Sequence, residues 1–379
     1  MKTYLSAIWL IIISFLPQAG FAQDATTFYN EGVKLKNEKK VAEAIEKFKK
    51  AVALRPDYTE ALYEWGWCQN DLKDYEGAII NLRKARTAWT AVPKVYFELG
   101  YAFEKSNRTD SAILTYNRCL ELKPDYSLVY KQLGYIAYNK NDNITALEHF
   151  KKYESFTKTE IKDYLYWYRK GFVYNALKDY TNAITALKQS ESFKSDYANT
   201  YLELGFACTR LKQDEEAISY FKKAIEIDPK SHIPYNGIGE VYRDNKKDMN
   251  EAMNWYQKSL TINPAERKAN FGMGYCLNST GKYNEAITYL KKAIESERDY
   301  VAAFVELGYS YYMTGKYTEA IDHCNKAISL SPKNENARYY AGLVYIKQNN
   351  KTMAQKMADE LKMLSSKLAA TLQAKVDAL

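Results

Sequence analysis

Apolar residues recur along this chain at the spacing of amphipathic helices, in two alternating patterns. In the first pattern, Tyr96, Leu99 and Phe103 share one helical face beside Gly100. In the second pattern, apolar residues stand at positions i, i+1, i+4, i+7 and i+8, as in Ala217, Ile218, Phe221, Ala224 and Ile225. Each pattern predicts a helix with one buried stripe, so the sequence predicts alternating helices that pair with each other.

A regular succession of glycines marks the first helix of each predicted pair. Most of them lie 34 residues apart, and they are Gly32, Gly66, Gly100, Gly134, Gly171, Gly205, Gly239, Gly274, Gly308 and Gly342. Alanine follows twelve residues after nine of these glycines and thirteen residues after Gly239, at Ala44, Ala78, Ala112, Ala146, Ala183, Ala217, Ala252, Ala286, Ala320 and Ala354. This periodicity predicts ten repeats, in which the two helices cross where small side chains let the backbones approach closely.

Turn-forming residues separate the predicted helices. Seven residues after the glycine, five repeats carry a residue type that tolerates the left-handed conformation at a helix end: Asn107, Asn141, Gly281, Gly315 and Asn349. The prolines that stop the second helices are Pro56, Pro124, Pro229, Pro264 and Pro332. Asp57 and Asp125 directly follow two of these prolines, and we expect them to cap the next first helix.

The set Gly205, Ala217, Phe221, Ala224 and Pro229 resembles the consensus of the tetratricopeptide repeat. The resemblance recurs ten times and covers residues 23–366. It implies an all-α fold, a right-handed superhelical solenoid of helix-turn-helix repeats whose first helices line a concave groove. In proteins of this type the groove binds peptides or partner proteins, and the repeats have little catalytic activity of their own.

Two stretches depart from the regular repeat. Near residues 153–166, between the fourth and fifth repeats, the chain has three extra residues, and we expect a change of superhelical pitch or a soft joint at 157–163. After the last repeat, residues 367–379 carry a stripe of Leu368, Leu372, Val376 and Leu379. Because the end face of a solenoid would otherwise be exposed, this stripe predicts a C-terminal capping helix.

The first residues have the pattern of a secretory signal peptide. Lys2 precedes a short apolar run from Leu5 to Leu16, and Gly20 and Ala22 have the small side chains that signal peptidase requires. We expect cleavage after Ala22, so that residues 1–22 form the signal peptide, which resembles those of Gram-negative bacteria. The apolar run is too short to span a bilayer and no later segment is apolar enough. The sequence therefore predicts a periplasmic or secreted protein without a stable membrane anchor.

Charge and cysteine content narrow the classes of function. The formal net charge of +8 is mild for 379 residues, and paired lysines recur at one place in the repeats, as on a solvated helix face. We therefore expect no nucleic-acid partner. The five cysteines all fall within predicted helices, at Cys68, Cys119, Cys208, Cys276 and Cys324. We expect them to pack as small apolar residues, while one disulfide stays open as an alternative because the chain is exported.

Aromatic residues concentrate on the face of the first helices that this family turns towards its groove. Of the twenty residues that lie three before or one after a repeat glycine, thirteen are aromatic. Tyr and Trp suit a binding groove because they give a large contact area and a polar tip. We expect a ligand or partner to contact Tyr29, Tyr63, Trp67, Phe97, Tyr101, Lys131, Tyr135, Tyr168, Phe172, Phe206, Asn236, Glu240, Arg243, Phe271, Tyr275, Tyr309 and Tyr339. Packing between neighbouring first helices is the alternative for any one of them.

The sequence contains no recognisable catalytic constellation. His149, His232 and His323 are isolated, and the register that His149 and His323 share in the second helix is typical of a surface position. We expect no metal, no cofactor and no enzyme activity. The leading interpretation is a non-catalytic protein-protein interaction scaffold that binds a peptide segment or a partner protein. A carbohydrate or peptidoglycan ligand is the alternative, and formation of a homo-oligomer through the aromatic face stays open.

Overall fold

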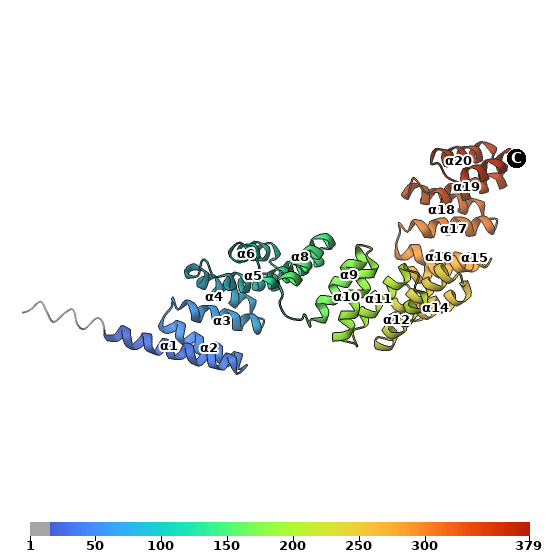
Figure 1. Ribbon diagram of the computed structural model, residues 1–379. Helices are drawn as coiled ribbons and strands as arrows, with labels where there is room; N and C mark the ends of the chain where they lie inside the picture. The colour runs from blue at the N-terminus through green and yellow to red at the C-terminus, as the bar shows by residue number, and fades with distance from the viewer. Residues whose placement is uncertain (1–15) are drawn as a thin grey trace, which may run out of the picture. The chain divides into compact units, whose positions relative to one another are not determined.

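The computed structural model describes residues 16–379, and the side chains from residue 24 onward. All regular structure in this part of the chain is helical, as the sequence predicts (Figure 1). Among the described helices, none has the length and apolarity that a membrane crossing demands. The predicted signal peptide, residues 1–22, lies largely outside the described residues, and its cleavage after Ala22 stays a prediction.

The described helices form ten successive pairs and one last helix. In chain order they are α1 (Leu16–Asn37), α2 (Val41–Leu54), α3 (Thr59–Asp71), α4 (Tyr75–Ala88), α5 (Pro93–Lys105), α6 (Thr109–Leu122), α7 (Ser127–Asn139), α8 (Asn143–Phe156), α9 (Tyr164–Ala176), α10 (Tyr180–Phe193), α11 (Ala198–Arg210), α12 (Asp214–Ile227), α13 (Ile233–Glu240) with η1 (Val241–Lys246), α14 (Met249–Ile262), α15 (Arg267–Ser279), α16 (Tyr283–Ser296), α17 (Val301–Met313), α18 (Tyr317–Leu330), α19 (Glu335–Lys347), α20 (Lys351–Met363) and α21 (Leu368–Asp377). Each pair contains one of the repeat glycines in its first helix, so the predicted order of helices is confirmed.

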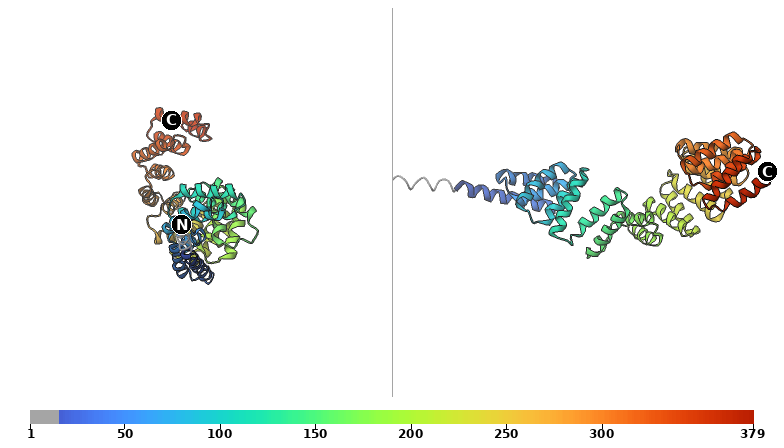
Figure 2. Two further views of the ribbon diagram at one scale, coloured as in Figure 1. Left: turned by 90° about the vertical axis from the view of Figure 1, so that its left-hand side faces the viewer. Right: turned by 90° about the horizontal axis from the view of Figure 1, so that it is seen from above.

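The chain divides into two compact units, Met1–Ile161 and Lys162–Leu379, which we call the N-terminal and the C-terminal unit. Within each unit, successive helices pack against one another, and most first helices also contact the first helix of the next pair (Figure 2). The division falls between α8 and α9, in the segment where the sequence has its three extra residues. The softness expected for residues 157–163 stays a prediction.

The two helices of a pair meet at the glycine of the first helix. A Cβ atom at Gly100 would lie 2.6 Å from the buried ring of Tyr116, which is closer than real Cβ contacts come. The same close approach recurs in eight of the other nine pairs, at Phe48, Leu82, Phe150, Leu187, Phe221, Tyr256, Leu290 and Cys324. The glycine thus mainly makes room for the side chain about sixteen residues later, while the repeat alanines, such as Ala112, are fully buried. This refines the predicted contact between glycine and alanine.

The turn inside each pair has one residue in the left-handed backbone conformation. The predicted residues adopt it, with φ of 61° at Asn107 and 79° at Gly281. In the other five pairs a lysine adopts this conformation, although lysine is not a residue type that favours it. These residues are Lys39, Lys73, Lys178, Lys212 and Lys247. Residues with a Cβ atom are strained in this conformation, so the packing of the helix pair must impose it.

The predicted helix caps at Asp57 and Asp125 are wrong. α3 and α7 begin one residue later than this prediction needs, and their N-cap residues are Tyr58 and Tyr126, which make no side-chain cap hydrogen bond. Tyr58 instead contacts the ring of Tyr29 in the preceding first helix, with centroids 5.1 Å apart. Packing between repeats therefore determines the residue at this position.

One first helix contains a π-helical turn. α13 ends at Glu240 and the chain continues as η1, whose wider turns accommodate an additional residue. This turn lies between Gly239 and Ala252. They belong to the repeat in which the glycine and the alanine are thirteen residues apart. The insertion explains the displaced alanine, and it places Arg243 within the first helix.

α21 fills a space that the other pairs fill from their own second helix. Sixteen residues after Gly342 stands Ala358, whose side chain is too short to reach it. A Cβ atom at Gly342 would instead lie 2.5 Å from Leu372 of α21. Leu372 and Val376 are both fully buried. The capping helix expected in residues 367–379 is present as α21.

Replacing Leu372 with alanine should destabilise the end of the C-terminal unit by about 2–5 kcal/mol, because the change leaves a cavity under a fully buried side chain. Hydrogen exchange measured by mass spectrometry should become faster in α19 and α20 and stay unchanged in the N-terminal unit. Leu379→Ala, which truncates an exposed leucine beyond the same helix, is the matched control. Equal protection of α19 in the wild type and in Leu372→Ala would contradict a capping role.

Candidate partner-binding groove

A hollow runs along the first helices α9, α11 and α13 of the C-terminal unit. Two pockets of about 630 and 840 Å³ form it. Both are lined by Glu203, Phe206 and Arg210 of α11, so the pockets adjoin each other. We call this hollow the groove. It lies on the face of the first helices where the sequence places most of its candidate residues.

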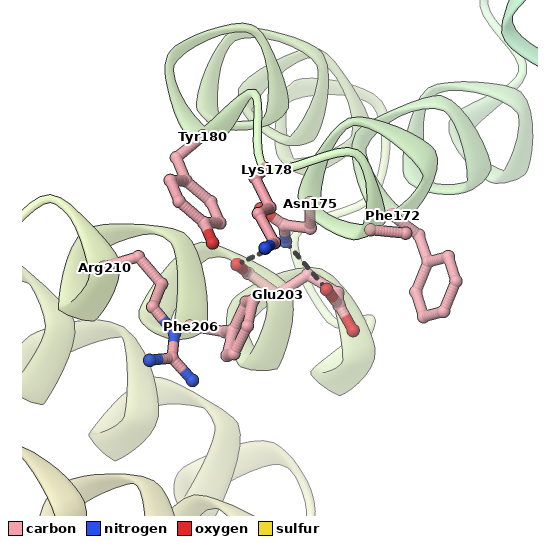
Figure 3. Close-up of a pocket in the computed structure, with 8 residues that line it drawn as sticks. Phe172, Asn175, Lys178, Tyr180, Glu203, Phe206 and Arg210 are labelled. Atoms are coloured by element: carbon pink, nitrogen blue, oxygen red, sulfur yellow. Dashed lines mark hydrogen bonds between the residues drawn. The ribbon is translucent and has the colours of Figure 1, made fainter. Parts of the chain in front are cut away.

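The smaller pocket is built around two hydrogen-bonded side chains from neighbouring first helices. The Asn175 amide donates to the backbone oxygen and to Oε2 of Glu203, at 3.0 and 2.7 Å (Figure 3). Burial raises the pKa of Glu203, and the hydrogen bond from Asn175 partly offsets the shift. Oδ1 of Asn175 is buried and accepts no hydrogen bond from the described residues. Because that oxygen is buried, the pair presents the Glu203 carboxylate to a ligand.

Aromatic rings flank this pair. Tyr180, at the start of α10, lies edge-to-face with Phe206, and the ring centroids are 6.2 Å apart. The Arg210 guanidinium lies 5.1 Å from the centroid of the Phe206 ring, at cation–π distance. Figure 3 shows these three side chains on one side of the hydrogen-bonded pair and Phe172 on the other. Apolar walls around a few polar groups are typical of binding pockets.

The π-helical turn positions Arg243 in the larger pocket. Its guanidinium donates to both carboxylate oxygens of Asp244, from Nε at 2.6 Å and from Nη2 at 2.7 Å. It also lies 5.9 Å from the centroid of Phe271 and 5.7 Å from that of Tyr275. The arginine is thus held between one carboxylate and two rings, so its position is fixed before any ligand arrives.

Other polar groups of the larger pocket come from the start of α13 and from the residue before α15. His232 Nε2 lies 3.1 Å from Glu266 Oε2. Asn236 is 5% exposed, and its Oδ1 accepts no hydrogen bond from the described residues. A buried acceptor without a donor costs free energy. The groove itself combines aromatic surface with polar and charged side chains.

The N-terminal unit contains a smaller pocket of the same construction, about 200 Å³ in volume. Asn70 donates to the backbone oxygen and Oε2 of Glu98, at 3.0 and 2.9 Å, as Asn175 does to Glu203. Tyr75 and Tyr101 lie edge-to-face with centroids 6.4 Å apart, as Tyr180 and Phe206 do in the C-terminal unit. Trp67 completes the lining together with Asp71 and Lys73. The recurrence shows that the pocket is a property of the repeat.

The structure separates the predicted site residues into two groups. Those that line the three pockets are Trp67, Tyr101, Tyr168, Phe172, Phe206, Asn236, Glu240 and Arg243. Those that line none of the three are Tyr29, Tyr63, Phe97, Lys131, Tyr135, Phe271, Tyr275, Tyr309 and Tyr339. Several residues three before the glycine pack on a tyrosine that precedes the next first helix, as Phe97 does on Tyr126 at 5.3 Å. The aromatic face thus serves both packing and the groove.

The asparagine and glutamate of each pair were not among the predicted site residues. They stand four residues after one glycine and two before the next, at Asn70 and Glu98, Asn175 and Glu203, and Asn278 and Glu306. This spacing of 28 residues is visible in the sequence, but two residues so far apart meet only when consecutive first helices lie side by side.

The five cysteines are free and buried, as the sequence predicts. Burial raises their pKa, to about 12 for Cys68 and about 11 for Cys208. His149 and His323 do not lie in the expected surface position. They are half-buried against rings, with His323 stacked on Tyr311 at 5.3 Å, and burial lowers the pKa of both histidines. Among the described residues, no three His, Cys, Asp or Glu side chains cluster as a metal site would need.

Family models identify the repeat independently. Models described as tetratricopeptide repeats match residues 33–94, 93–126, 164–197, 198–231 and 308–349, together more than half of the chain. A model of subunit 3 of the anaphase-promoting complex, or cyclosome, matches residues 245–327.

The similar proteins are also built of helix pairs. Anaphase-promoting complex subunit 3 of Schizosaccharomyces pombe is 25% identical over 218 residues, which cover 54% of this chain and 32% of that protein. The structure of the anaphase-promoting complex hetero-tetramer Cut9–Hcn1 aligns with a TM-score of 0.51 and 14% identity over 94% of this chain and 91% of that chain. PilW, a type IV pilus biogenesis factor, aligns with a TM-score of 0.50 and 20% identity over 55% of this chain and 98% of that chain. These likenesses confirm the fold class, and the chain spans less than half the length of the curated relatives it matches.

The Glu98→Gln variant should flatten the dependence of stability on pH. Burial raises the pKa of Glu98 to about 7, with the Asn70 hydrogen bond opposing the shift and the charge of Glu64 adding to it. Between 4.5, the ordinary pKa of a glutamate, and about 7, the folded chain binds more protons than the unfolded chain, so stability falls as pH rises through this window. The loss should be on the order of 1–3 kcal/mol.

Urea titrations between pH 4.5 and 8 measure this loss as the difference between the wild type and the variant. Glu43→Gln, which alters an exposed glutamate of the same unit, is the control and should keep the wild-type slope. Identical slopes in the wild type and in Glu98→Gln would show that the Glu98 carboxyl is not protonated in the folded chain at these pH values.

Proposed function

Because this chain belongs to the tetratricopeptide repeat family, we propose that it is a non-catalytic scaffold that binds a partner protein through an extended segment lying in the groove. The observation that carries the proposal is the continuity of the two pockets along three consecutive first helices, α9, α11 and α13. Because the two pockets together extend along three helices, they suit a stretch of polypeptide better than a compact small molecule. Single small-molecule sites typically have volumes of about 300–1,000 Å³.

The chemistry of the groove also supports a polypeptide ligand. The carboxylates of Glu203 and Glu240, which line the groove, can accept hydrogen bonds from backbone N–H groups, which an extended segment presents along its length. Phe172, Phe206 and Tyr168 provide half-buried rings that can cover alternate side chains of such a segment. Aromatic residues of this kind carry much of the binding free energy in protein interfaces.

Other functions have less support. The names of two of the similar proteins described above place them in a protein assembly, the anaphase-promoting complex, which favours a protein partner over the carbohydrate alternative. The groove residues include no nucleophile with an adjacent base, so we assign no catalytic step to this chain. We further propose that residues 1–22 direct export, on the strength of their charge and apolar pattern, and that the partner is encountered in the periplasm or outside the cell.

Replacing two groove rings, Tyr168→Ala with Phe206→Ala, should abolish capture of the partner and leave the helical content unchanged. The measurement is crosslinking capture with the chain from residue 23 onward as bait, from envelope and cytosolic extracts separately, followed by mass spectrometry. Circular dichroism verifies the fold. We expect at least a tenfold loss of the captured partner, which corresponds to about 1.4 kcal/mol or more for two interface rings.

A matched double variant, Tyr289→Ala with Ile262→Ala, alters second helices of the same unit and should capture as much partner as the wild type. The proposal fails if the groove variant captures the same proteins as the wild type. It also fails if the wild-type chain binds glycans on an array and captures no protein from the envelope extract.

A further inference from the structure

The first junction between repeats contains a complete binding arrangement for a cation. The ammonium of Lys36 lies 2.5 Å from a carboxylate oxygen of Glu64 and 5.1 Å from the centroid of the Trp67 ring. Lys36 stands four residues after its glycine, Glu64 two before the next glycine and Trp67 one after it. A carboxylate beside an aromatic face is a favourable environment for an ammonium or guanidinium group.

The next junction repeats this arrangement without the cation. Glu98 and Tyr101 take the places of Glu64 and Trp67, and Asn70 takes the place of Lys36. In the part of the chain that the structure describes, no lysine or arginine forms an ion pair with Glu98. Its partner is the Asn70 amide, which cannot neutralise a carboxylate. Lys105 does lie 5.1 Å from the centroid of the Tyr101 ring, but its ion pair is with Glu104. No cation of the described chain therefore joins the ring to the carboxylate here, as Lys36 does at the first junction.

The pocket at this second junction has carboxylates that can receive a cation. Glu98 lines the pocket, and Asn70, which is 6% exposed, holds its carboxylate by a hydrogen bond. Asp71 adds a second carboxylate to the lining, against the single amino group of Lys73. A pocket of about 200 Å³ is smaller than a typical small-molecule site and suits one side chain.

We infer that the pocket lined by Trp67, Asn70, Asp71, Tyr75, Glu98 and Tyr101 receives one lysine or arginine side chain of the bound partner. The inference deepens the proposed function and rests on it, because the side chain belongs to the polypeptide that the repeats bind. The ammonium or guanidinium donates to the Glu98 carboxylate, which the Asn70 amide holds in place, and the rings surround its aliphatic stem and its charge.

The equivalent places in the C-terminal unit provide contrasts within the same chain. Beside Asn175 and Glu203, Ala176 stands where the N-terminal unit has Asp71, and Arg210 lines the pocket, so that pocket is less negative. At the third such pair, Oδ1 of Asn278 already accepts a hydrogen bond of 2.7 Å from Ser310. Ser279 stands beside Asn278 in the place of Asp71, so of the three pairs only that of Asn70 and Glu98 has a second carboxylate next to it.

The test uses fluorescence polarisation with the chain from residue 23 onward and two fluorescein-labelled peptides of repeated Gly-Ser-Arg or Gly-Ser-citrulline units. Citrulline has the shape of arginine without its charge. Because the chain carries a net positive charge, general electrostatic attraction does not favour the arginine peptide. We expect the arginine peptide to bind about tenfold or more tightly than the citrulline peptide, as a charge-assisted contact beside an aromatic ring implies.

The double variant Asp71→Asn with Glu98→Gln should remove this preference for arginine, whereas the matched variant Glu203→Gln in the C-terminal unit should keep it. Equal binding of the two peptides by the wild-type chain would overturn the inference, and so would an arginine preference that survives the double variant. The capture experiment with the ring variants does not depend on charge. A partner that is lost with Tyr168→Ala and Phe206→Ala, in a chain that shows no arginine preference, would therefore refute the cation pocket and leave the proposed scaffold function intact.

Discussion

The close contact between each repeat glycine and one side chain of the following helix determines the rest of the structure. At Gly134 a Cβ atom would lie 2.5 Å from the ring of Phe150, which is fully buried. Two helices that approach this closely have little freedom to rotate about their axes, because rotation would remove the ring from the space above the glycine. The same contact, repeated along the chain, fixes which face of every first helix meets its partner and which face stays free. The groove consists of these free faces.

The exceptions show how strictly the contact is maintained. The last pair has only Ala358 at the usual place, and Leu372 of α21 enters the space above Gly342 from outside the repeat. The pair of Gly239 has one residue more than the others, and a π-helical turn accommodates it so that Tyr256 still packs on the glycine. In that second case the adjustment has a consequence for the groove, because the altered turn carries Arg243.

The fold was largely predictable from the sequence, since a periodic contact leaves a periodic pattern. The predicted turn at Asn107 is confirmed, whereas Lys73 adopts the same left-handed conformation without any signal in its residue type. The cap predicted at Asp57 is wrong because the tyrosine after it is the N-cap residue and packs on the preceding repeat. Local sequence rules describe one helix end at a time, and neither of these positions is determined locally.

The candidate site was predictable only in part. Phe206 and Trp67 were predicted from their place beside a glycine, and both line pockets. The pairing of Asn70 with Glu98 was not predicted, because the contact joins two repeats and depends on the spacing between first helices. The pocket beside this pair likewise depends on how the side chains of two repeats pack together.

A double-mutant cycle on Gly134 and Phe150 tests the central claim most directly. Gly134→Ala alone should destabilise the chain by about 1–3 kcal/mol, because the added methyl group overlaps the Phe150 ring. In a Phe150→Ala background the ring is absent, so the same substitution should cost little, and the coupling free energy from urea titrations should exceed about 1 kcal/mol. Additive effects of the two substitutions, within about 0.5 kcal/mol, would contradict the account.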